Sequence, residues 1–192
     1  GNLTHRMKAW VETAPGWYSK STMSIPVGKF YWECLYNPAS KDNPAWGILN
    51  GVDSGSNNPL ISGTASSTGD IVSFWPANDN SNRYYKNGTQ IAGKTGENFG
   101  VGEIGMCCVE MQANGIGKIW FGARGVWFND GNPSSSSNEI TTFSGTVFPA
   151  FDSPAGAGAV WIINFGQDPT FTGEKTDSAG FAPTDGSPGL FY

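Results

Sequence analysis

Residues 101–132 constrain the fold most, because they contain two apolar runs separated by a turn. Residues 104–111 are apolar at nearly every position, which is typical of a central strand that is covered on both faces. Residues 112–117 supply Asn and Gly, which tolerate positive φ, and the aromatic and β-branched run at 118–121 returns from that turn. A shorter break and a third run follow at 122–128. The stretch therefore predicts a β-meander.

The rest of the chain carries similar short apolar runs between turn residues. Asn87-Gly88 is the sequence of a type I′ turn and predicts a tight hairpin. No stretch supports a long helix, and residues 133–138 are expected to form a flexible tip. This turn density predicts an all-β fold, a two-sheet antiparallel β-sandwich. The further strands are expected at residues 22–25, 29–36, 45–49, 71–75, 83–86, 89–92, 140–143, 147–148 and 159–165, with an exposed loop over 53–69.

Length and composition favour one domain and argue against two classes of partner. The 192 residues fit a single sandwich, with a core over about 20–170 and an irregular tail over 167–192. The net charge is -5 and no Lys/Arg cluster occurs, which argues against nucleic acid and anionic membranes. No apolar run is long enough for membrane insertion. The chain starts without Met and in mid-pattern, as a fragment of a longer protein would.

The three cysteines, Cys34, Cys107 and Cys108, lie in apolar strand patterns. Their odd number and the adjacency of two of them argue against a disulfide framework, so we expect buried free thiols that behave as small hydrophobes. A zinc site would need Cys-x-x-Cys or histidine partners, and the sequence has one histidine, His5. We therefore expect no metal centre and no cofactor.

No catalytic residues are predicted. Glycoside hydrolases pair carboxylates on one strand face, whereas Glu33, Glu103 and Glu110 stand alone in their strands and are expected to be structural partners of backbone or arginine. Residues 100–105 match Gly-x-Gly-x-x-Gly, but a strand is expected after them where a phosphate loop needs a helix. A Ser-His-Asp triad would have to use His5, which lies near a chain end.

The candidate binding residues are aromatic side chains at strand ends, beside loops rich in Asn and Asp. Sugar- and protein-binding clefts use such aromatic platforms together with amide and carboxylate groups. The alternative is that these rings fill the core, as we expect for Trp32, Trp46, Trp120 and Trp161. The aromatic candidates are Trp75, Tyr84, Tyr85 and Trp127, and the polar candidates are Asp79, Asn129, Asp130 and Asn132.

Two oxygen-rich loops, residues 78–82 and 129–132, resemble calcium-binding segments in composition. Neither ends in the Glu that a strong calcium loop carries, so turn chemistry explains them better than a cation does.

Three groups of residues follow one another in a recognisable order: Gly28-Lys-Phe-Tyr-Trp-Glu33, then Gly105 with Gly117-Lys-Ile-Trp-Phe121 and Gly125-Val-Trp127, then Val147-Phe-Pro-Ala150 with Asn164-Phe-Gly166. This order resembles the SPRY domain family. In that family an early strand carries Gly-x-x-Tyr-Trp-Glu, a central hairpin leads to an aromatic residue, and a proline-containing strand precedes a late Asn-Phe-Gly. Gly131-Asn-Pro133 and Gln167 are similar to the branch found in bacteriophage and marine viral structural proteins.

The resemblance implies a concanavalin-like β-sandwich that works as a non-catalytic recognition module, binding a protein segment through loops at one end. In virus particles such modules are parts of a tail or head fibre or of a capsid decoration. The implied location is the virion surface, after assembly in the host cytoplasm. The implied partners are other virion proteins or a host surface protein or glycan, with a homotrimer as one arrangement.

The sequence departs from the SPRY pattern in two places. Ala123-Arg124 stands where an Asn-Gly turn is usual, which alters a turn and not the fold, and an extra hairpin at residues 69–92 offers a binding surface or a subunit contact. A carbohydrate-binding lectin domain of the same architecture is the alternative function. A polysaccharide-cleaving enzyme is the third.

Overall fold

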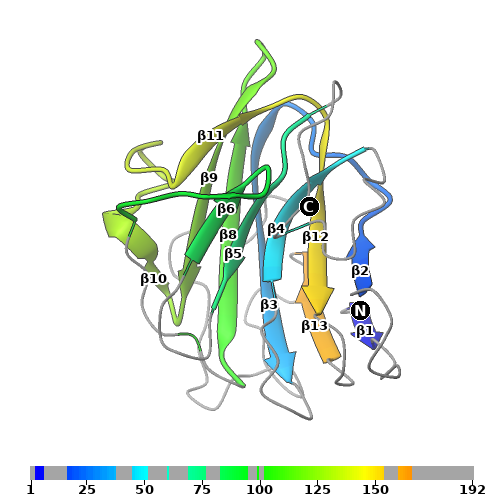
Figure 1. The fold of residues 1–192 in the computed structure, drawn as a ribbon. Coiled ribbons are helices and arrows are strands. Elements are labelled where there is room, and N and C mark those ends of the chain that lie inside the picture. Colours follow the sequence, from blue (N-terminus) through cyan, green and yellow to red (C-terminus); the bar gives the residue numbers. More distant parts are fainter. Residues whose placement is uncertain are drawn as a thin grey trace.

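The protein is a two-sheet antiparallel β-sandwich (Figure 1). The computed structural model describes residues 3–6, 17–37, 45–51, 60, 69–76, 83–94, 99, 102–153 and 160–165. The first sheet has the order β1 (Leu3–Arg6), β13 (Val160–Asn164), β3 (Gly28–Asn37), β8 (Ile104–Met111), β9 (Ile116–Ala123) and β10 (Val126–Trp127), and β11 (Thr141–Ser144) also pairs with β9. The second sheet has the order β2 (Trp17–Lys20), β12 (Val147–Ser153), β4 (Ala45–Asn50), β5 (Val72–Trp75), β6 (Arg83–Lys86) and β7 (Thr89–Gln90).

The predicted central hairpin is confirmed as β8 and β9, in the middle of the first sheet. Successive residues of a strand point to opposite faces, and β8 is apolar on both. Cys107 and Val109 belong to the core between the sheets, whereas Met106 and Cys108 belong to a cluster on the outer face. The turn between the strands places Gly115 at a φ of 79°, which a glycine adopts without steric cost.

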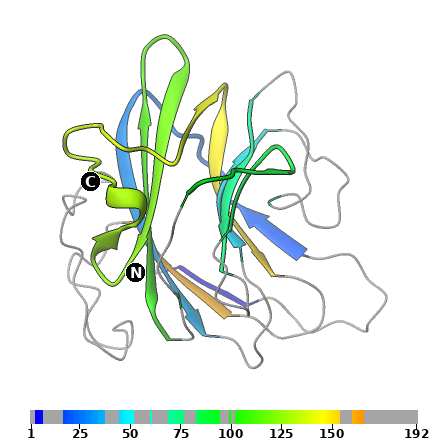
Figure 2. The same ribbon diagram turned by 60° about the vertical axis from the view of Figure 1, so that its left-hand side comes forward.

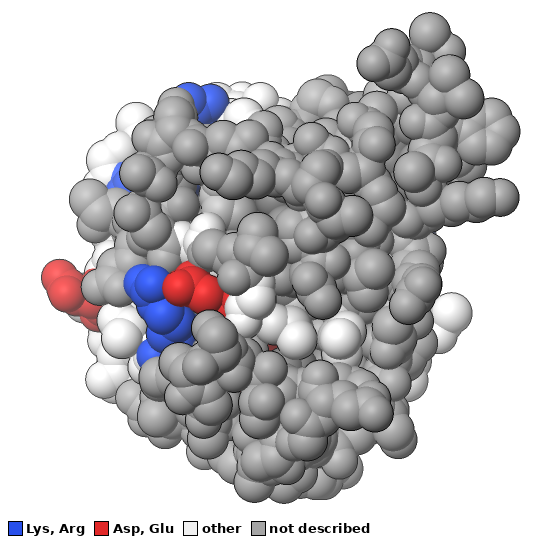
Figure 3. All heavy atoms as spheres, turned by 90° about the horizontal axis from the view of Figure 1, so that it is seen from below, with Lys and Arg blue, Asp and Glu red and all other residues white. Residues whose placement is uncertain are grey.

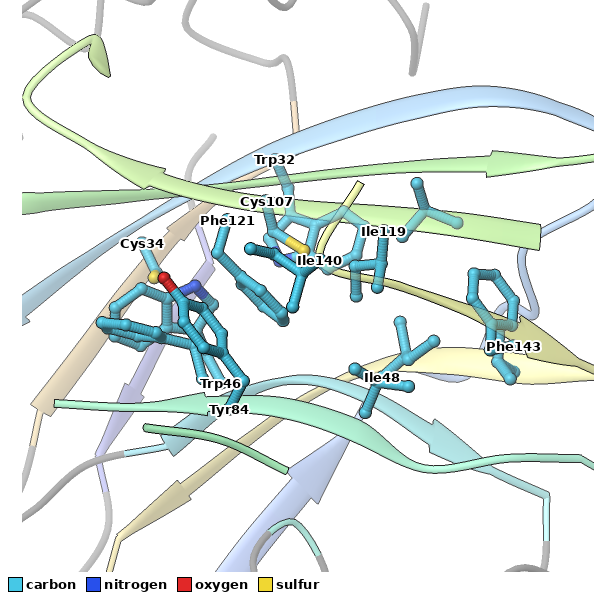
Figure 4. Packing of buried hydrophobic residues seen from close by; sticks show 14 of the residues in the cluster. Trp32, Cys34, Trp46, Ile48, Tyr84, Cys107, Ile119, Phe121, Ile140 and Phe143 are labelled. Carbon is cyan, nitrogen blue, oxygen red and sulfur yellow. The ribbon is translucent and has the colours of Figure 1, made fainter. Parts of the chain in front are cut away.

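The core lies between the two sheets and is dominated by aromatic rings (Figure 4). Trp32 and Phe121 of the first sheet project toward Trp46 and Tyr84 of the second, and all four are fully buried. The predicted burial of Trp32, Trp46 and Trp120 is confirmed, each with 0% of its surface exposed, although Trp120 belongs to the cluster on the outer face of the first sheet. The side chain of Trp161 lies outside the described residues.

Gly105 of β8 allows the indole of Trp46 to approach the first sheet. A Cβ at this position would lie 2.7 Å from Cζ2 of Trp46. The ring reaches across the core, with its centroid 4.7 Å from that of Phe74 and 6.4 Å from that of Phe121. The glycine is therefore required by packing against the opposite sheet.

Strand β12 shows why the edge strand β2 is short. The ladder between them ends at the pair of Ala150 with Lys20, and the next contact is a hydrogen bond of 2.9 Å from the Ser21 amide to the Pro149 carbonyl. Proline accepts this bond but has no N–H to donate in return. Regular pairing is interrupted there, as proline near a sheet edge usually ensures, and the chain bonds to β12 again where the Ile25 amide donates to the Val147 carbonyl at 2.9 Å.

On the open side of the sandwich, where β10 and β11 face β5 and β6, several residues contact both sheets. After β10 the chain forms one turn of 3-10 helix, η1 (Phe128–Asp130), and Phe128 is buried with its ring 5.1 Å from that of Phe74 in β5. Farther along, the β11 edge strand is bound to the second sheet by Asp70 and Lys86. The view turned by 60° shows β11 and the β6–β7 hairpin approaching each other across this side (Figure 2).

Three local expectations are wrong. Residues 22–25 are a loop and not a strand, because Ser21 Oγ bonds to the Met23 carbonyl and turns the chain before Pro26. Leu60, expected in an exposed loop, is fully buried, and its carbonyl accepts a hydrogen bond from Ser73 Oγ. Residues 133–138, expected to be a flexible tip, are a compact loop with many internal hydrogen bonds.

Candidate binding surfaces

The structure separates the predicted binding residues into two groups on different sheets. Trp75 and Tyr85 lie together on the outer face of the second sheet, whereas Trp127 and the polar residues Asn129, Asp130 and Asn132 lie at the β10–η1 edge of the first. Asp79 lies outside the described residues. No single site therefore contains all of the predicted residues whose positions are described.

Tyr84 is not a surface residue. It has 0% exposure and packs in the core, with its ring 5.2 Å from Phe74 and 6.1 Å from Phe121. The reason is that successive side chains of β6 point to opposite faces of the sheet. Tyr84 is paired with the inward-facing Phe74, while its neighbours Arg83 and Tyr85 face outward. Burial also raises the pKa of the Tyr84 hydroxyl, so this group stays protonated.

Trp75, Arg83 and Tyr85 form a half-buried surface that we call the aromatic ledge. Trp75 and Arg83 are directly paired across β5 and β6, and the guanidinium carbon of Arg83 lies 5.0 Å above the centre of the Trp75 ring. The Tyr85 ring is also close to Trp75, with the two ring centroids 5.9 Å apart and the ring planes at an angle of 53°. A cation held over an indole face is attractive and restricts both side chains. The ledge is thus ordered before any partner arrives.

The ledge rests on a small apolar cluster that covers the outer face of the second sheet. Trp75 and Tyr18 pack against this cluster, and the Nε1 atom of Trp75 is buried with no hydrogen-bond partner in the part of the chain that the structure describes. The indole therefore contacts both the apolar cluster and Arg83. The cluster consists of Ala45, Leu49, Leu60, Ile71 and Ala150.

Trp127, the aromatic candidate of the second group, is buried and not exposed. It is 7% exposed and packs on the outer face of the first sheet in a cluster with Tyr31, whose ring it meets edge-on at 5.9 Å. Trp127 ends the short β10 strand, and the following Phe128 enters the core, so the two rings hold this segment from both sides. The expectation of an exposed platform at Trp127 is wrong.

Residues 129–138, which we call the αL loop, hold most of the non-glycine residues with positive φ in the part of the chain that the structure describes. Asn129, Asp130, Ser136 and Asn138 have φ values of 58°, 53°, 56° and 53°, in the left-handed region. Asn and Asp tolerate this region better than other residues, and serine does so less readily. Strained backbone that is held by its surroundings is more frequent at functional sites than elsewhere.

The αL loop is fastened to the outer face of the first sheet by its own carbonyl groups. Lys118 Nζ donates to the Ser136 carbonyl at 2.7 Å, and Trp120 Nε1 donates to the Ser137 carbonyl at 2.8 Å. Lys29 Nζ donates to the Pro133 carbonyl and to Ser136 Oγ, the latter at 3.2 Å. Asp130, Asn132 and several serines are left facing solvent. The loop can therefore present polar groups in fixed positions.

Sequence reasoning missed Arg83, Lys29 and Lys118, which the structure places in these two surfaces. Arg83 and Lys118 alternate with apolar neighbours in their strands, and this shows that they face outward but not what they contact. Their partners lie in loops or adjacent strands that are distant in sequence. No local signal identifies such pairs.

Each of the isolated glutamates has a side-chain partner, and for Glu103 this partner is an arginine, as predicted. Glu103 pairs with Arg124 at 2.9 Å, and Glu110 lies 3.9 Å from Lys29. Glu33 is 1% exposed and accepts a hydrogen bond of 2.6 Å from the Tyr31 hydroxyl. Burial and then the charge of Glu33 raise the pKa of Tyr31, so its hydroxyl is held protonated and does not act as a nucleophile.

The lower end of the sandwich shows basic and acidic atoms side by side (Figure 3). The β9–β10 turn lies at this end, and it has two residues, Arg124 and Gly125, with φ values of 50° and 73°. These angles fit the two-residue hairpin that usually carries Asn-Gly. The substitution by Arg124 therefore leaves the turn type unchanged.

Among the residues that the structure describes, no three His, Cys, Asp or Glu side chains are grouped so that they could hold a metal ion. The three cysteines are free and buried, as predicted. Within the same described ranges, no helix is long and apolar enough to cross a membrane.

Comparison with protein-family models found no match, and comparison with curated proteins found none either. Solved structures do match. The SPRY domain of human HERC1 aligns with a TM-score of 0.53 at 15% identity, covering 85% of this chain and 96% of that chain. The TRIM65 PSpry domain aligns with a TM-score of 0.46 at 15% identity, covering 77% of this chain and 70% of that chain. The chain has a SPRY-like fold.

Proposed function

We propose that the protein is a non-catalytic binding module that recognises a protein partner through the aromatic ledge. The SPRY-like fold supports this function, because the SPRY domains that the sequence resembles are recognition modules. The ledge is the observation that carries the proposal, since it combines a Trp, an Arg and a Tyr that are already stacked on one another. These three residue types dominate the binding energy of protein interfaces.

The contacts of Trp75 favour a protein over a sugar. A sugar ring needs an open aromatic face to stack on, but the guanidinium of Arg83 already lies over the Trp75 ring. The indole Nε1 is buried and so cannot donate to a sugar hydroxyl. Protein interfaces, in contrast, draw most of their binding energy from tryptophan, arginine and tyrosine and do not require an open indole face. The lectin function remains the competing outcome of the test below.

We place the module in a virus particle, as part of a tail or head fibre or as a capsid decoration. The support is the resemblance of Gly131-Asn-Pro133 and of Asn164-Phe-Gly166 with Gln167 to viral structural proteins. The partner is then another virion protein or a host surface protein. The proposed location is the virion surface.

Site-directed photo-crosslinking tests the ledge. A photoreactive phenylalanine analogue at position 85 is expected to form adducts with a protein of the virion or of the host surface. The same analogue at position 116, where Ile116 is 46% exposed on the other sheet, is the matched control and is expected to give none. Equal adducts at both positions, or adducts at 116 alone, would place the interface elsewhere.

Affinity measurements with the captured protein complete the test. Tyr85→Ala and Arg83→Ala are each expected to weaken binding by roughly 30-fold, the effect of losing a hot-spot residue of about 2 kcal/mol. Val126→Ala, a change at a side chain of the other sheet that is 48% exposed, should leave the affinity unchanged. A glycan array probed with the same proteins decides the alternative: glycan binding that Tyr85→Ala abolishes would identify a lectin.

A further inference from the structure

Three Asn-Gly pairs occur in the sequence, at Asn50-Gly51, Asn87-Gly88 and Asn114-Gly115. In such a pair the backbone nitrogen of the glycine can attack the side-chain amide of the asparagine, because glycine has no Cβ to block the approach. The reaction needs the asparagine side chain to leave its hydrogen bonds and rotate onto that nitrogen. The chemistry is the same at the three pairs, so the fold decides which of them reacts.

Asn50 and Asn87 are held firmly. Asn50 is 1% exposed, and its Nδ2 donates to the Gly69 carbonyl at 3.0 Å. Asn87 Oδ1 accepts the Ile71 amide at 2.8 Å, and its Nδ2 donates to Asp70 Oδ1 at 2.7 Å. Both ends of the Asn87 amide are thus bound to a neighbouring strand segment. Rotation onto the glycine nitrogen would break these contacts.

Asn114 is held weakly. It lies exposed at the tip of the β8–β9 hairpin, and its Oδ1 accepts the amide of Ile116 at 3.0 Å, within the same turn. Its Nδ2 lies 3.5 Å from Oε1 of Gln112, at the limit of a hydrogen bond. The Gly115 amide donates to the Gln112 carbonyl at 3.0 Å, so the tip must open for the reaction. Exposed hairpin tips open at little cost compared with core strands.

We propose that Asn114 is a site of spontaneous deamidation in the folded protein. The Gly115 nitrogen forms a bond to Cγ of Asn114, the bond from Cγ to Nδ2 breaks, and ammonia leaves with the proton of the Gly115 amide. Water then adds to the succinimide ring. Opening the ring at the bond between Cγ and the Gly115 nitrogen gives aspartate, and opening it at the main-chain carbonyl gives isoaspartate.

The products change the end of the sandwich. Either product adds one negative charge two residues before Ile116, an exposed apolar side chain. Isoaspartate also adds a carbon to the main chain inside the turn, which alters the hydrogen bond of 3.0 Å from the Gln112 amide to the Ile116 carbonyl. The hairpin tip therefore changes in charge and shape with the age of the molecule.

Peptide mapping by mass spectrometry tests the proposal with all three pairs in one sample. The intact chain is incubated in mildly alkaline buffer, with and without denaturant. In the native sample we expect Asn114 to convert at least about tenfold faster than Asn87 or Asn50, because each of those must break further buried contacts. In denaturant the three rates should become comparable. Equal native rates at the three pairs, or an unreacted Asn114 while the denatured chain converts, would overturn the proposal.

Two variants identify the cause of the difference. Asn114→Gln needs a larger, slower-forming ring, so the acidic species that accumulates in the wild type on isoelectric focusing should be absent. Asp70→Ala removes the partner of Asn87 Nδ2 and should raise conversion at Asn87 while leaving Asn114 unchanged. The persistence of the acidic species in Asn114→Gln would contradict the assignment, as would an unchanged Asn87 rate in a folded Asp70→Ala protein.

Discussion

Asp70 and Ser144 are joined by three hydrogen bonds across the open side of the sandwich, one of them from Ser144 Oγ to Oδ2 of Asp70 at 3.3 Å. The Asp70 amide donates to the Ser144 carbonyl at 2.9 Å, and the Ser144 amide donates to Oδ2 of Asp70 at 2.9 Å. Lys86 Nζ adds an ion pair with Asp70 at 3.3 Å and a hydrogen bond of 2.7 Å to the Thr142 carbonyl. Outward-facing backbone groups of the β11 edge are thereby satisfied, which protects this edge against pairing with another chain.

Asp70→Asn is expected to destabilise the protein by about 1–3 kcal/mol, because charge-assisted hydrogen bonds are weakened. The effect depends on pH. Partial burial raises the pKa of Asp70, but the hydrogen bond from Asn87, the charge of Lys86 and the Ser144 amide outweigh it and hold the pKa below its usual value. The stabilisation is therefore present above the unfolded pKa of about 3.9 and is lost as the pH falls through the folded pKa.

Urea denaturation near neutral pH and at a pH of about 3 measures this difference. The gap between wild type and Asp70→Asn should shrink at the lower pH. Ser134→Ala, a change at an exposed and uncharged side chain, serves as the control and should follow the wild type at both pH values. A gap between wild type and Asp70→Asn that is constant with pH would show that the ionised carboxylate is not responsible.

Gly117→Ala is expected to destabilise the protein by about 1–3 kcal/mol through overpacking. A Cβ at this position would overlap the ring of Phe143, which is 1% exposed and cannot move into solvent. Gly93→Ala is the matched control, with open space around its Cβ but a φ of 73°, so it reports backbone strain without overlap. The double variant Gly117→Ala with Phe143→Leu should recover part of the loss, and thermal unfolding would reveal this recovery.

Arg124→Val is expected to be less stable than Arg124→Asn by about 1–2 kcal/mol, because a β-branched residue fits the φ of 50° poorly. Both variants lose the ion pair with Glu103, whose partly exposed geometry limits its value to about 1 kcal/mol. The comparison thus isolates the turn. Equal urea midpoints for the two variants would mean that the turn relaxes to another shape.

The three thiols are expected to be unreactive in the native state. Burial is the main reason why the pKa values of Cys34 and Cys107 are well above the usual value for a thiol. Burial also raises the pKa of Cys108 to about 12. Little thiolate is therefore present at neutral pH. Alkylation followed by intact-mass measurement should find no label in the native protein and three labels in denaturant. Native labelling of Cys108 alone would show that the outer cluster around Tyr31 opens to solvent.

The sandwich was predictable from the sequence because its strongest signals are local. The apolar run that became β8 and the Asn87-Gly88 turn each specify a conformation within a few residues. The placement of Tyr84 was not predictable, because two adjacent tyrosines in β6 occupy both faces and the sequence does not show which face is buried. The end of β2 at Lys20 is set by Pro149, which is distant in the chain.

The candidate surfaces were predictable only in part. Trp75 and Tyr85 were identified by their position at strand ends, but their relation to Arg83 depends on the register between β5 and β6. In the αL loop, Asn129 and Asp130 are types that tolerate positive φ, whereas Ser136 adopts it because Lys29 and Lys118 hold the loop from the sheet below. Such restraint from distant residues leaves no trace in the local sequence.

Strand β1 pairs with β13, and Leu3 lies opposite Ile163. During synthesis the N-terminal strand therefore waits for its partner until residues 160–164 have left the ribosome, which at about 5–20 residues per second takes roughly ten to thirty seconds. For that time the backbone of β1 is open to pairing with another nascent chain. Of these two strands, β1 is thus synthesised long before it can be paired. A chaperone would matter most for this strand.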